Sequence, residues 1–342
     1  MNRRTVLSAA AAAAVALLLA GYSAYWWLMA ERLQDGLDAW VAAENQAGLT
    51  VDADRTPIAG YPFSFRTTFR RPHVSGTLAG QPIDWQGADV EAWLWPFDLL
   101  ALHLTTAGRH SAVIAGQAAT LDASALSVEL HFDGRGALSA VDASSGTVTV
   151  SLADGKTIAA QSATASFDAP ATPPQSDHDP LLQFSVSAVA LKLPPDVQLL
   201  TPSPVDTIAV QGTVKAPMPQ APLKSALAGW RDQGGAVEIT SFSAAQAPLS
   251  VSGSATIALD ADLQPIVAAN LAAKGLGPAI DLLAQQKRIK PNDVLKVKLF
   301  IAATEQKAPD GGKQVTSGIT IQNGYLYLGP FKVARLARIE WP

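Results

Sequence analysis

The sequence predicts a mainly β protein, in which an N-terminal transmembrane helix is followed by an elongated, strongly curved antiparallel β-sheet with a few helices. Three observations lead to this prediction. A long uncharged segment opens the chain. Short segments of alternating apolar and polar residues fill most of the remaining chain. Turns rich in Gly and Asp separate these segments at intervals of about ten residues, which is typical of antiparallel strands.

The opening segment is predicted to be a membrane anchor over residues 1–30. No charged residue lies between Arg4 and Glu31, and a helix of about 20 residues crosses a hydrocarbon core of about 30 Å. Arg3 and Arg4 favour a cytoplasmic N-terminus, because positive charge is retained on that side. We therefore expect a single-pass inner-membrane protein with its body in the periplasm. Aromatic residues suited to the membrane interface close the segment: Tyr22, Tyr25, Trp26 and Trp27.

A cleaved signal peptide is the alternative interpretation of the same segment. Gly21 and Ser23 are small residues that suit cleavage before Ala24, and Arg3-Arg4 loosely resembles a twin-arginine export signal. Apolar residues continue through Met29, past the usual length of a signal peptide, so we favour an uncleaved anchor. Both interpretations place the body outside the cytoplasm.

The composition indicates a folded body and excludes several function classes. Of the 342 residues, 48% are hydrophobic and 16% are charged, which is unlike a disordered chain. A net charge of −4 gives no basic surface for nucleic acid. The chain contains no cysteine, which removes disulfides, thiolate metal sites and cysteine nucleophiles.

Residues 31–48 are predicted to form an amphipathic helix that connects the anchor to the body. Such a helix can continue directly from the membrane span. Its apolar stripe must then pack on the body, so we expect a rigid junction rather than a flexible linker. The stripe consists of residues at positions i, i+4, i+7 and i+8: Leu33, Leu37, Trp40 and Val41.

Residues 49–169 are predicted to form a first β-rich half. Phe63, Phe65 and Phe69 alternate with polar residues, which is the period of a half-buried strand. Ala153-Asp154-Gly155-Lys156 separates two strand-like segments and predicts a hairpin. The other segments with strand-like alternation are 73–78, 88–94, 110–114, 116–121, 125–132, 146–152 and 157–167.

Residues 170–180 contain four prolines and are predicted to be an exposed loop or the boundary between two similar halves. The second β-rich half spans 181–342, with helices near 223–233 and 278–290. Polar–Gly–polar segments recur in both halves, around Gly76, Gly212 and Gly253. Glycine inside a strand often marks a bulge or a bend, so this repeated pattern predicts a curved sheet. Strands rich in the same small residues would also show the pattern through composition alone.

Short motifs resemble those of a bacterial envelope family known only as a domain of unknown function. They are Gly60-Tyr61-Pro62, Trp95-Pro96, and the closing Gly-x-x-x-Leu-Gly-Pro at Gly324–Pro330, together with the N-terminal span. The pattern of alternating strand segments is similar to that of the wider AsmA-like group of membrane-tethered β-groove proteins. This resemblance implies a fold, an envelope location and a role in phospholipid movement or outer-membrane upkeep. It defines no functional residues.

No motif for covalent chemistry or metal binding is evident. The histidines (His73, His103, His110, His131 and His178) form no pair at the spacing of a metal site, and Asp177-His178-Asp179 lies in the proline-rich loop, which favours a solvated turn. The sequence contains no Gly-x-Ser-x-Gly motif and no phosphate-binding loop before a helix. We therefore expect no enzyme activity, no metal and no cofactor, with a concealed hydrolase site as the least favoured alternative.

Aromatic residues of the first half suggest where a ligand binds. An ordinary core explains them, but a sheet that curls without closing would present them as an apolar trough suited to acyl chains. The leading hypothesis is a lipid-binding or lipid-transfer module, and the alternative is an envelope scaffold that binds protein partners through its sheet edge. The predicted trough consists of Phe63, Phe65, Phe69, Trp93, Trp95 and Phe97.

Overall fold

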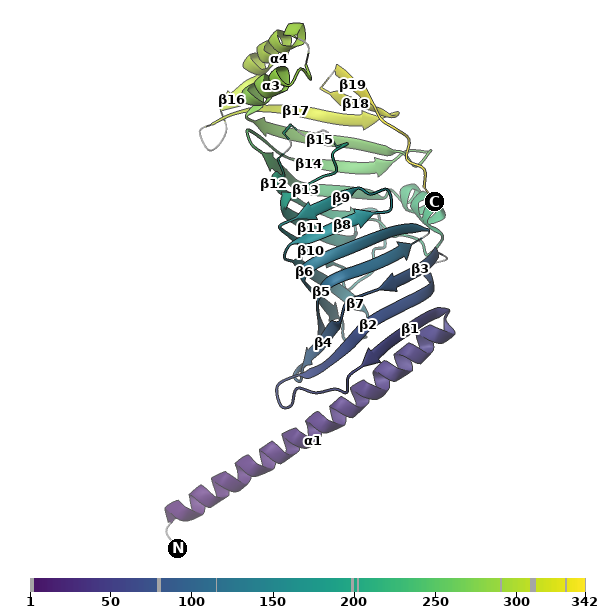
Figure 1. The fold of residues 1–342 in the computed structure, drawn as a ribbon, viewed down its shortest axis with the longest axis vertical. Coiled ribbons are helices and arrows are strands. Elements are labelled where there is room, and N and C mark those ends of the chain that lie inside the picture. The colour runs from purple at the N-terminus through teal and green to yellow at the C-terminus, as the bar shows by residue number, and fades with distance from the viewer. Residues whose placement is uncertain are drawn as a thin grey trace. The chain divides into compact units, whose positions relative to one another are not determined.

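The computed structural model describes residues 3–78, 81–114, 116–197, 200–201, 203–289, 291–307, 312–329 and 331–341. Met1, Lys290 and Pro330, at the ends of predicted segments, lie outside the described residues. The mainly β fold is confirmed, with a large antiparallel sheet that follows an apolar N-terminal helix (Figure 1). The helices are α1 (Arg3–Gln46), α2 (Leu223–Asp232), α3 (Leu276–Gln285) and α4 (Pro291–Thr304).

Many strands fall on the alternating segments of the sequence, but β7 was not expected, residues 116–121 and 125–132 belong to one strand, and β5 begins at Asp98 rather than at His110. The strands are β1 (Leu49–Arg55), β2 (Phe65–Leu78), β3 (Gln81–Gln86), β4 (Val90–Trp95), β5 (Asp98–Ile114), β6 (Gln117–Phe132), β7 (Leu138–Ser145), β8 (Val148–Leu152), β9 (Thr157–Ala160), β10 (Ser162–Asp168), β11 (Pro180–Leu191), β12 (Val205–Lys215), β13 (Ala236–Gln246), β14 (Leu249–Leu259), β15 (Pro265–Lys274), β16 (Glu305–Lys307), β17 (Lys313–Gln322), β18 (Tyr325–Leu328) and β19 (Phe331–Arg335).

The chain divides into two compact units. The first comprises Met1–Thr120 and Ser127–Leu130, and the second comprises Leu121–Leu126 and His131–Pro342, so β6 has residues in both. The proline-rich residues 170–180 do not separate the units. They connect β10 to β11, which pair directly from Ser162–Val189 to Asp168–Gln183. The prolines therefore belong to a long hairpin loop inside the second unit.

In the first unit, β2 is the central strand. It pairs with β1 on one side, and on the other side with β4 near its start and β3 near its end. β5 then pairs with both β3 and β4. Gly76 adopts a φ of +141°, and a Cβ there would lie 2.1 Å from the carbonyl oxygen of Gly48, so this close approach of β1 to β2 requires glycine.

In the second unit, consecutive pairings form an extended antiparallel sheet in the order β7–β10–β11–β12–β13–β14–β15–β17–β18–β19. The hairpin predicted at residues 153–156 is confirmed, because Ser151 of β8 pairs with Thr157 of β9. The predicted helices correspond to α2 and α3.

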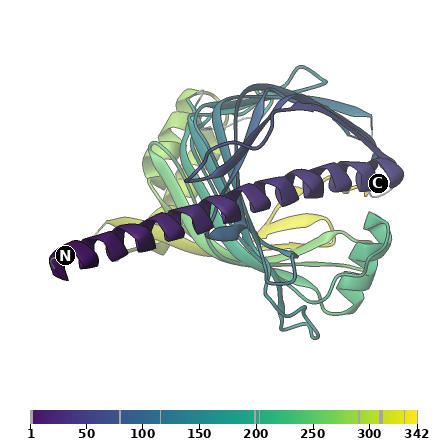
Figure 2. The ribbon, with the colours of Figure 1, turned by 90° about the horizontal axis from the view of Figure 1, so that it is seen from below.

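The anchor and the amphipathic segment form one continuous helix, α1. It is long enough and apolar enough to span a membrane. Figure 2 shows its C-terminal part lying along the strands of the first unit, while its N-terminal part extends past them. Arg55 of β1 donates to the Asp38 carboxylate at 2.6 Å, and the Asn45 side chain accepts from the Val51 amide at 2.9 Å. Leu33, Leu37 and Val41 of the predicted stripe are half-buried, whereas Trp40 is 50% exposed.

Candidate functional site

The strand register of the second unit separates apolar from polar side chains onto opposite faces of its sheet. Residues that stand opposite each other in an antiparallel pair share a face, and alternate residues along a strand share it too. Following the register from strand to strand gives one continuous surface, which we call the apolar face. It consists of Val141, Ala143, Ala163, Ala165, Phe167, Leu182, Phe184, Val186, Ala188, Ile208, Val210, Val214, Val237, Ile239, Phe242, Ala244, Val251, Ala255, Ile257, Val267, Ala269, Leu271, Ala273, Val315, Ile319 and Ile321.

Most of the apolar face remains accessible. Of its side chains, only Ala273 and Val315 are buried; Val186 is 41% exposed, and the others are half-buried. Val315 packs with Ile280 of α3 and Ile301 of α4, so these helices cover the end of the face. The other residues of the face belong to neither buried cluster among the described residues.

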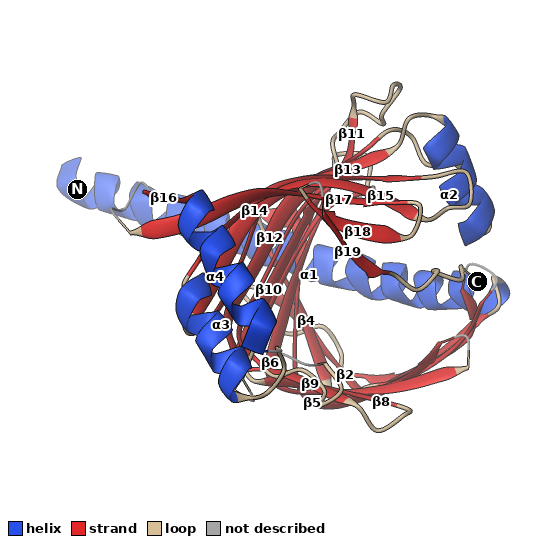
Figure 3. Ribbon diagram, turned by 90° about the horizontal axis from the view of Figure 1, so that it is seen from above, coloured by secondary structure: helices blue, strands red, loops and turns tan. Residues whose placement is uncertain are grey.

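The helices of the second unit lie at the two ends of its strands (Figure 3). At one end, the Trp230 indole of α2 donates to the Lys215 carbonyl at 2.7 Å. At the other end, the Gln286 side chain, next to α3, donates to the Leu200 carbonyl at 3.0 Å. Each helix follows or precedes a strand and remains near that strand's end, so the middle of the face has no helix over it in this unit.

The whole apolar face, including the end that α3 and α4 cover, measures roughly 34 Å by 20 Å across β7 to β17, because strands lie about 4.8 Å apart and alternate residues about 6.8 Å apart. Large contiguous apolar patches on a protein surface mark binding surfaces. No charged side chain belongs to the residues that define the face.

Glycine and aromatic residues shape this face. Gly212 stands opposite Phe184, and Gly253 stands opposite Phe242. A Cβ at Gly253 would lie 2.8 Å from the Phe242 ring and 2.0 Å from the Asn270 carbonyl oxygen, so the ring occupies the space above the glycine. β13 also bulges between Ile239 and Phe242. Bulges bend a strand and increase its twist, which supports the bends expected at these two glycines.

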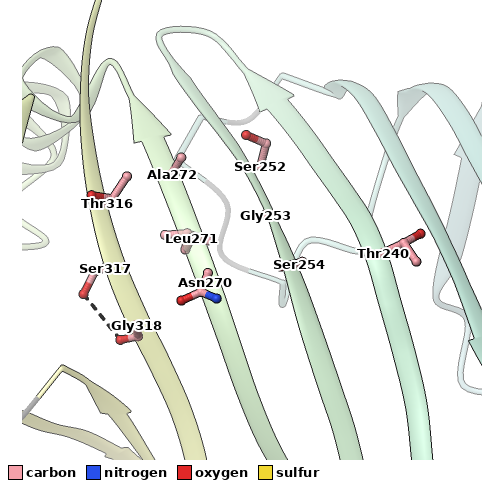
Figure 4. Close-up of a pocket in the computed structure, with 10 residues that line it drawn as sticks. All are labelled: Thr240, Ser252, Gly253, Ser254, Asn270, Leu271, Ala272, Thr316, Ser317 and Gly318. Atoms are coloured by element: carbon pink, nitrogen blue, oxygen red, sulfur yellow. Dashed lines mark hydrogen bonds between the residues drawn. The ribbon is translucent and has the colours of Figure 1, made fainter. Parts of the chain in front are cut away.

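The opposite face of the same strands is polar. Small residues of β13, β14, β15 and β17 leave a shallow hollow of about 520 Å³ there. Figure 4 shows that the residues around it come from neighbouring strands, with Asn270 and Thr316 among them. Ser, Thr, Asn and Gly bind water readily and require no partner. This face is therefore suited to solvent.

A second cavity, of about 720 Å³, lies beside the loop that joins β11 to β12. The Gln246 side chain holds this loop in place: its oxygen accepts from the Leu200 amide and its nitrogen donates to the Ser203 carbonyl at 2.7 Å. The lining is largely apolar with cationic groups at its margin, a combination that suits an amphiphile. It includes Leu193, Pro194, Pro195, Val197, Pro204, Lys192 and Arg288.

The predicted aromatic trough of the first unit requires correction. In the pairing of β2 with β4, Phe65 stands opposite Leu94, whereas Trp93 stands opposite Arg66. Phe65 and Phe69 therefore lie on one face of the sheet, and Trp93 and Trp95 lie on the other, where Trp93 stacks on His103 at 3.8 Å between ring centroids. Phe63 and Phe97 lie in loops and are 74% and 84% exposed. Side chains on opposite faces cannot line one trough.

The aromatic residues of α1 also differ from the prediction. Trp27 is exposed, but Trp26 is only 1% exposed, because it stacks on Phe65 with 5.1 Å between ring centroids. Its indole donates to the Ser64 carbonyl at 3.3 Å. Trp26 therefore attaches the helix to the sheet rather than facing lipid. Ala30 and Phe65 complete this buried cluster.

The motifs that carry the family resemblance contact the same part of α1. The Tyr22 hydroxyl donates to the Pro62 carbonyl, and the Tyr25 hydroxyl donates to the Pro96 carbonyl at 2.7 Å. Gly60 has a φ of +104°, a conformation that favours glycine. Gly-Tyr-Pro and Trp-Pro are thus docking elements for the helix, a role that the sequence alone did not indicate.

Ionisable groups in the described residues form surface pairs rather than a reactive cluster. His73 lies 3.3 Å from Asp84, and His131 lies 3.6 Å from Asp142. Within the described ranges, no three His, Asp or Glu residues gather as a metal site would require. Backbone hydrogen bonds from Ala137 and a side-chain bond from Arg135 lower the pKa of Asp133, which lies in the turn between β6 and β7.

Comparison with known proteins identifies the family of the chain. No curated protein and no solved structure matches it significantly. A family model described as "Uncharacterized protein conserved in bacteria (DUF2125)" matches residues 26–337, from Trp26 in α1 to the end of the sheet. The chain therefore belongs to the DUF2125 family of bacterial proteins.

Proposed function

We propose that this protein is a non-enzymatic lipid-binding protein of the bacterial envelope, anchored by α1 in the inner membrane with its body in the periplasm. It binds the acyl part of a lipid or a similar amphiphile on the apolar face and releases it again in envelope maintenance. The observation that carries the proposal is the accessible, uncharged apolar face of the second unit.

The chemistry of the face favours alkyl chains over a protein partner. Apart from Ser145, Ser317 and Gln246, which the register also places on this face, its side chains are aliphatic or phenyl groups. Such a surface has few of the hydrogen-bonding groups that fix a protein partner in register. Each methylene removed from water contributes about 0.8 kcal/mol, so an acyl chain along the strands gains binding energy without specific polar contacts. The apolar helix of the same chain provides proximity to a source of lipid.

The docking of α1 supports a permanent anchor. Ser23 and Tyr61 share a hydrogen bond of 2.7 Å, and Tyr25 and Trp26 contact the body directly afterwards. Cleavage before Ala24 would cut the helix inside its docked segment. Mass spectrometry of the N-terminus of the cellular protein tests this point, and a mature chain that begins at Ala24 would contradict the anchor.

Photocrosslinking in membranes tests lipid binding directly. A benzophenone amino acid replaces Val186 on the apolar face or Ser185 on the polar face of the same strand, in the full chain within its native membrane. We expect crosslinks to lipid at position 186 and not at 185. Lipid crosslinks at both positions, or at neither, would contradict the proposal.

A charge on the face provides a second test. Val210 stands opposite Val186, so Val210→Asp places a carboxylate beside the crosslinking position. We expect it to abolish the lipid crosslink at 186, whereas Thr213→Asp, on the polar face of the same strand, retains it. Crosslinks from position 186 to another protein would instead support the scaffold alternative.

A further inference from the structure

Two aromatic loops of the first unit lie beside α1 at the level where the helix enters the membrane. One comprises residues 60–64 and the other residues 95–98. Tyr22 stacks on Phe97 with 5.7 Å between ring centroids, and Ser23 bonds to Tyr61. Both loops therefore meet the same turn of the helix.

The uncharged segment places this turn near the end of the membrane span. The segment runs from Thr5 to Ala30, which is about 39 Å of helix at about 1.5 Å per residue and exceeds a hydrocarbon core of about 30 Å. Its last residues, from Tyr25 onward, therefore extend into the membrane–water interface. The structure leaves Leu17, Leu18 and Leu19 exposed, as lipid contact requires.

The loops leave large apolar groups exposed, although some of these rings also contact α1. Phe63 is 74% exposed and Phe97 is 84% exposed, while Tyr61 and Trp95 are about half exposed at 47% and 49%. Water is a poor solvent for four such rings in adjacent loops, whereas the interface of a bilayer favours them. Trp26 and Phe65 lie immediately behind the loops and hold them in place.

The rest of the first unit lies farther along α1. β2 begins at Phe65 beside Trp26, and it reaches Gly76 opposite Leu49, just after the helix ends. The strands therefore extend along the helix away from the membrane, and these two loops are at the membrane end.

We propose that residues 60–64 and 95–98 insert their aromatic side chains into the interface of the lipid bilayer, on the side from which α1 emerges. α1 and the two loops then contact the membrane at three points, and these contacts hold the first unit against the bilayer surface. The partner is a phospholipid surface, recognised through ring insertion and not through charge, since neither loop carries Lys or Arg.

Single cysteines provide the test, because the native chain contains none. Phe63→Cys and Phe97→Cys are labelled with an environment-sensitive fluorophore in the full chain, reconstituted in vesicles of phosphatidylcholine and phosphatidylglycerol. The control is Ile114→Cys, which is also exposed but lies about 50 Å away along β5 at about 3.3 Å per residue.

We expect blue-shifted emission at positions 63 and 97, and loss of most of it when the vesicles contain lipid with a nitroxide at the headgroup level. The label at position 114 should emit as in water and keep its intensity. Water-like emission at either loop would overturn the proposal, because both must lie at one depth. Retained tryptophan emission from the Trp26–Phe65 cluster confirms that the variants are folded.

The proposal rests on the membrane anchoring by α1 proposed above, but it does not depend on lipid binding by the apolar face. The insertion of the loops concerns the first unit, whereas lipid crosslinking concerns Val186 in the second. Water-like emission at positions 63 and 97 together with lipid crosslinks at position 186 would reject only the insertion of the loops. Blue-shifted emission at positions 63 and 97 without lipid crosslinks at position 186 would reject only lipid binding by the apolar face.

Discussion

Both units contain antiparallel strands with an apolar face, but the two faces differ in how far helices cover them. In the first unit, the face that carries Phe65 is met by a helix of the same chain, and Trp26 is buried against it. In the second unit, the helices remain at the strand ends and the middle of the face is accessible. The apolar face of the first unit is therefore covered by α1 of the same chain, whereas α3 and α4 cover only the end of the face in the second unit.

The largest expected loss of stability comes from removing the Trp26 side chain, which packs on the apolar face of the first unit. Trp26→Ala should destabilise the first unit by about 3–5 kcal/mol, because it leaves a cavity against Phe65 and an unpaired carbonyl at Ser64. Hydrogen–deuterium exchange of β2 and β4 in the full chain measures the loss. The neighbouring Trp27→Ala removes an exposed ring and should change exchange by less than about 0.5 kcal/mol. Equal effects would show that Trp26 is not the docking residue.

In the second unit, no helix lies over the middle of the apolar face, and the pairs Gly212–Phe184 and Gly253–Phe242 pack within it. Gly253→Ala should cost about 1–3 kcal/mol, since the added methyl group meets the Phe242 ring and the Asn270 carbonyl. Gly318→Ala is the matched control: its Cβ would meet only the Ala269 carbonyl oxygen, at 4.0 Å, and we expect no loss. Exchange rates of β13 and β14 provide the measurement. No difference between the variants would mean that the face is not held by this packing.

A smaller effect is expected at the polar contact between α1 and the first sheet. Arg55 is largely buried while its partner Asp38 is mostly exposed, so Asp38→Ala should cost about 0.5–1 kcal/mol, and less at high salt. Exchange at β1 measures this loss. A cost near that of Trp26→Ala would mean that charge, rather than aromatic packing, attaches the helix.

The smallest effect concerns a turn remote from both faces. The pKa of Asp133 is lowered by its hydrogen bonds in the folded state, so its contribution to stability is present above the ordinary carboxyl pKa and is lost as pH falls through the folded pKa. Exchange of the Ala137 amide, corrected for intrinsic rate, should lose protection in acid. Asp133→Asn should abolish this pH dependence. If the exposed carboxylate shows no such dependence, the turn is held by its backbone alone.

The sequence predicted many of the strands, because their alternation is a local property, but it missed β7 and divided β6 into two segments. It also predicted a helix over residues 31–48, although Trp40 of the expected stripe is 50% exposed. It did not predict which strands pair. Trp93 and Phe65 belong to neighbouring alternating segments, but their face depends on the register between β2 and β4, which no single segment contains.

Composition was also an incomplete guide to boundaries and burial. The prolines of residues 170–180 indicate a loop, but not whether the flanking strands pair with each other, as β10 and β11 do. Tryptophans at the end of an apolar helix indicate a membrane interface, but Trp26 faces the sheet and Trp27 does not. One residue of offset is about 100° of rotation on a helix, which decides between lipid and protein surroundings.

The continuity of α1 has a mechanical consequence. Because no flexible linker separates the helix from the first unit, that unit cannot swivel independently of its anchor. Any tilt of α1 is therefore transmitted directly to β1 and β2, and the displacement of a strand end grows with its distance from the helix.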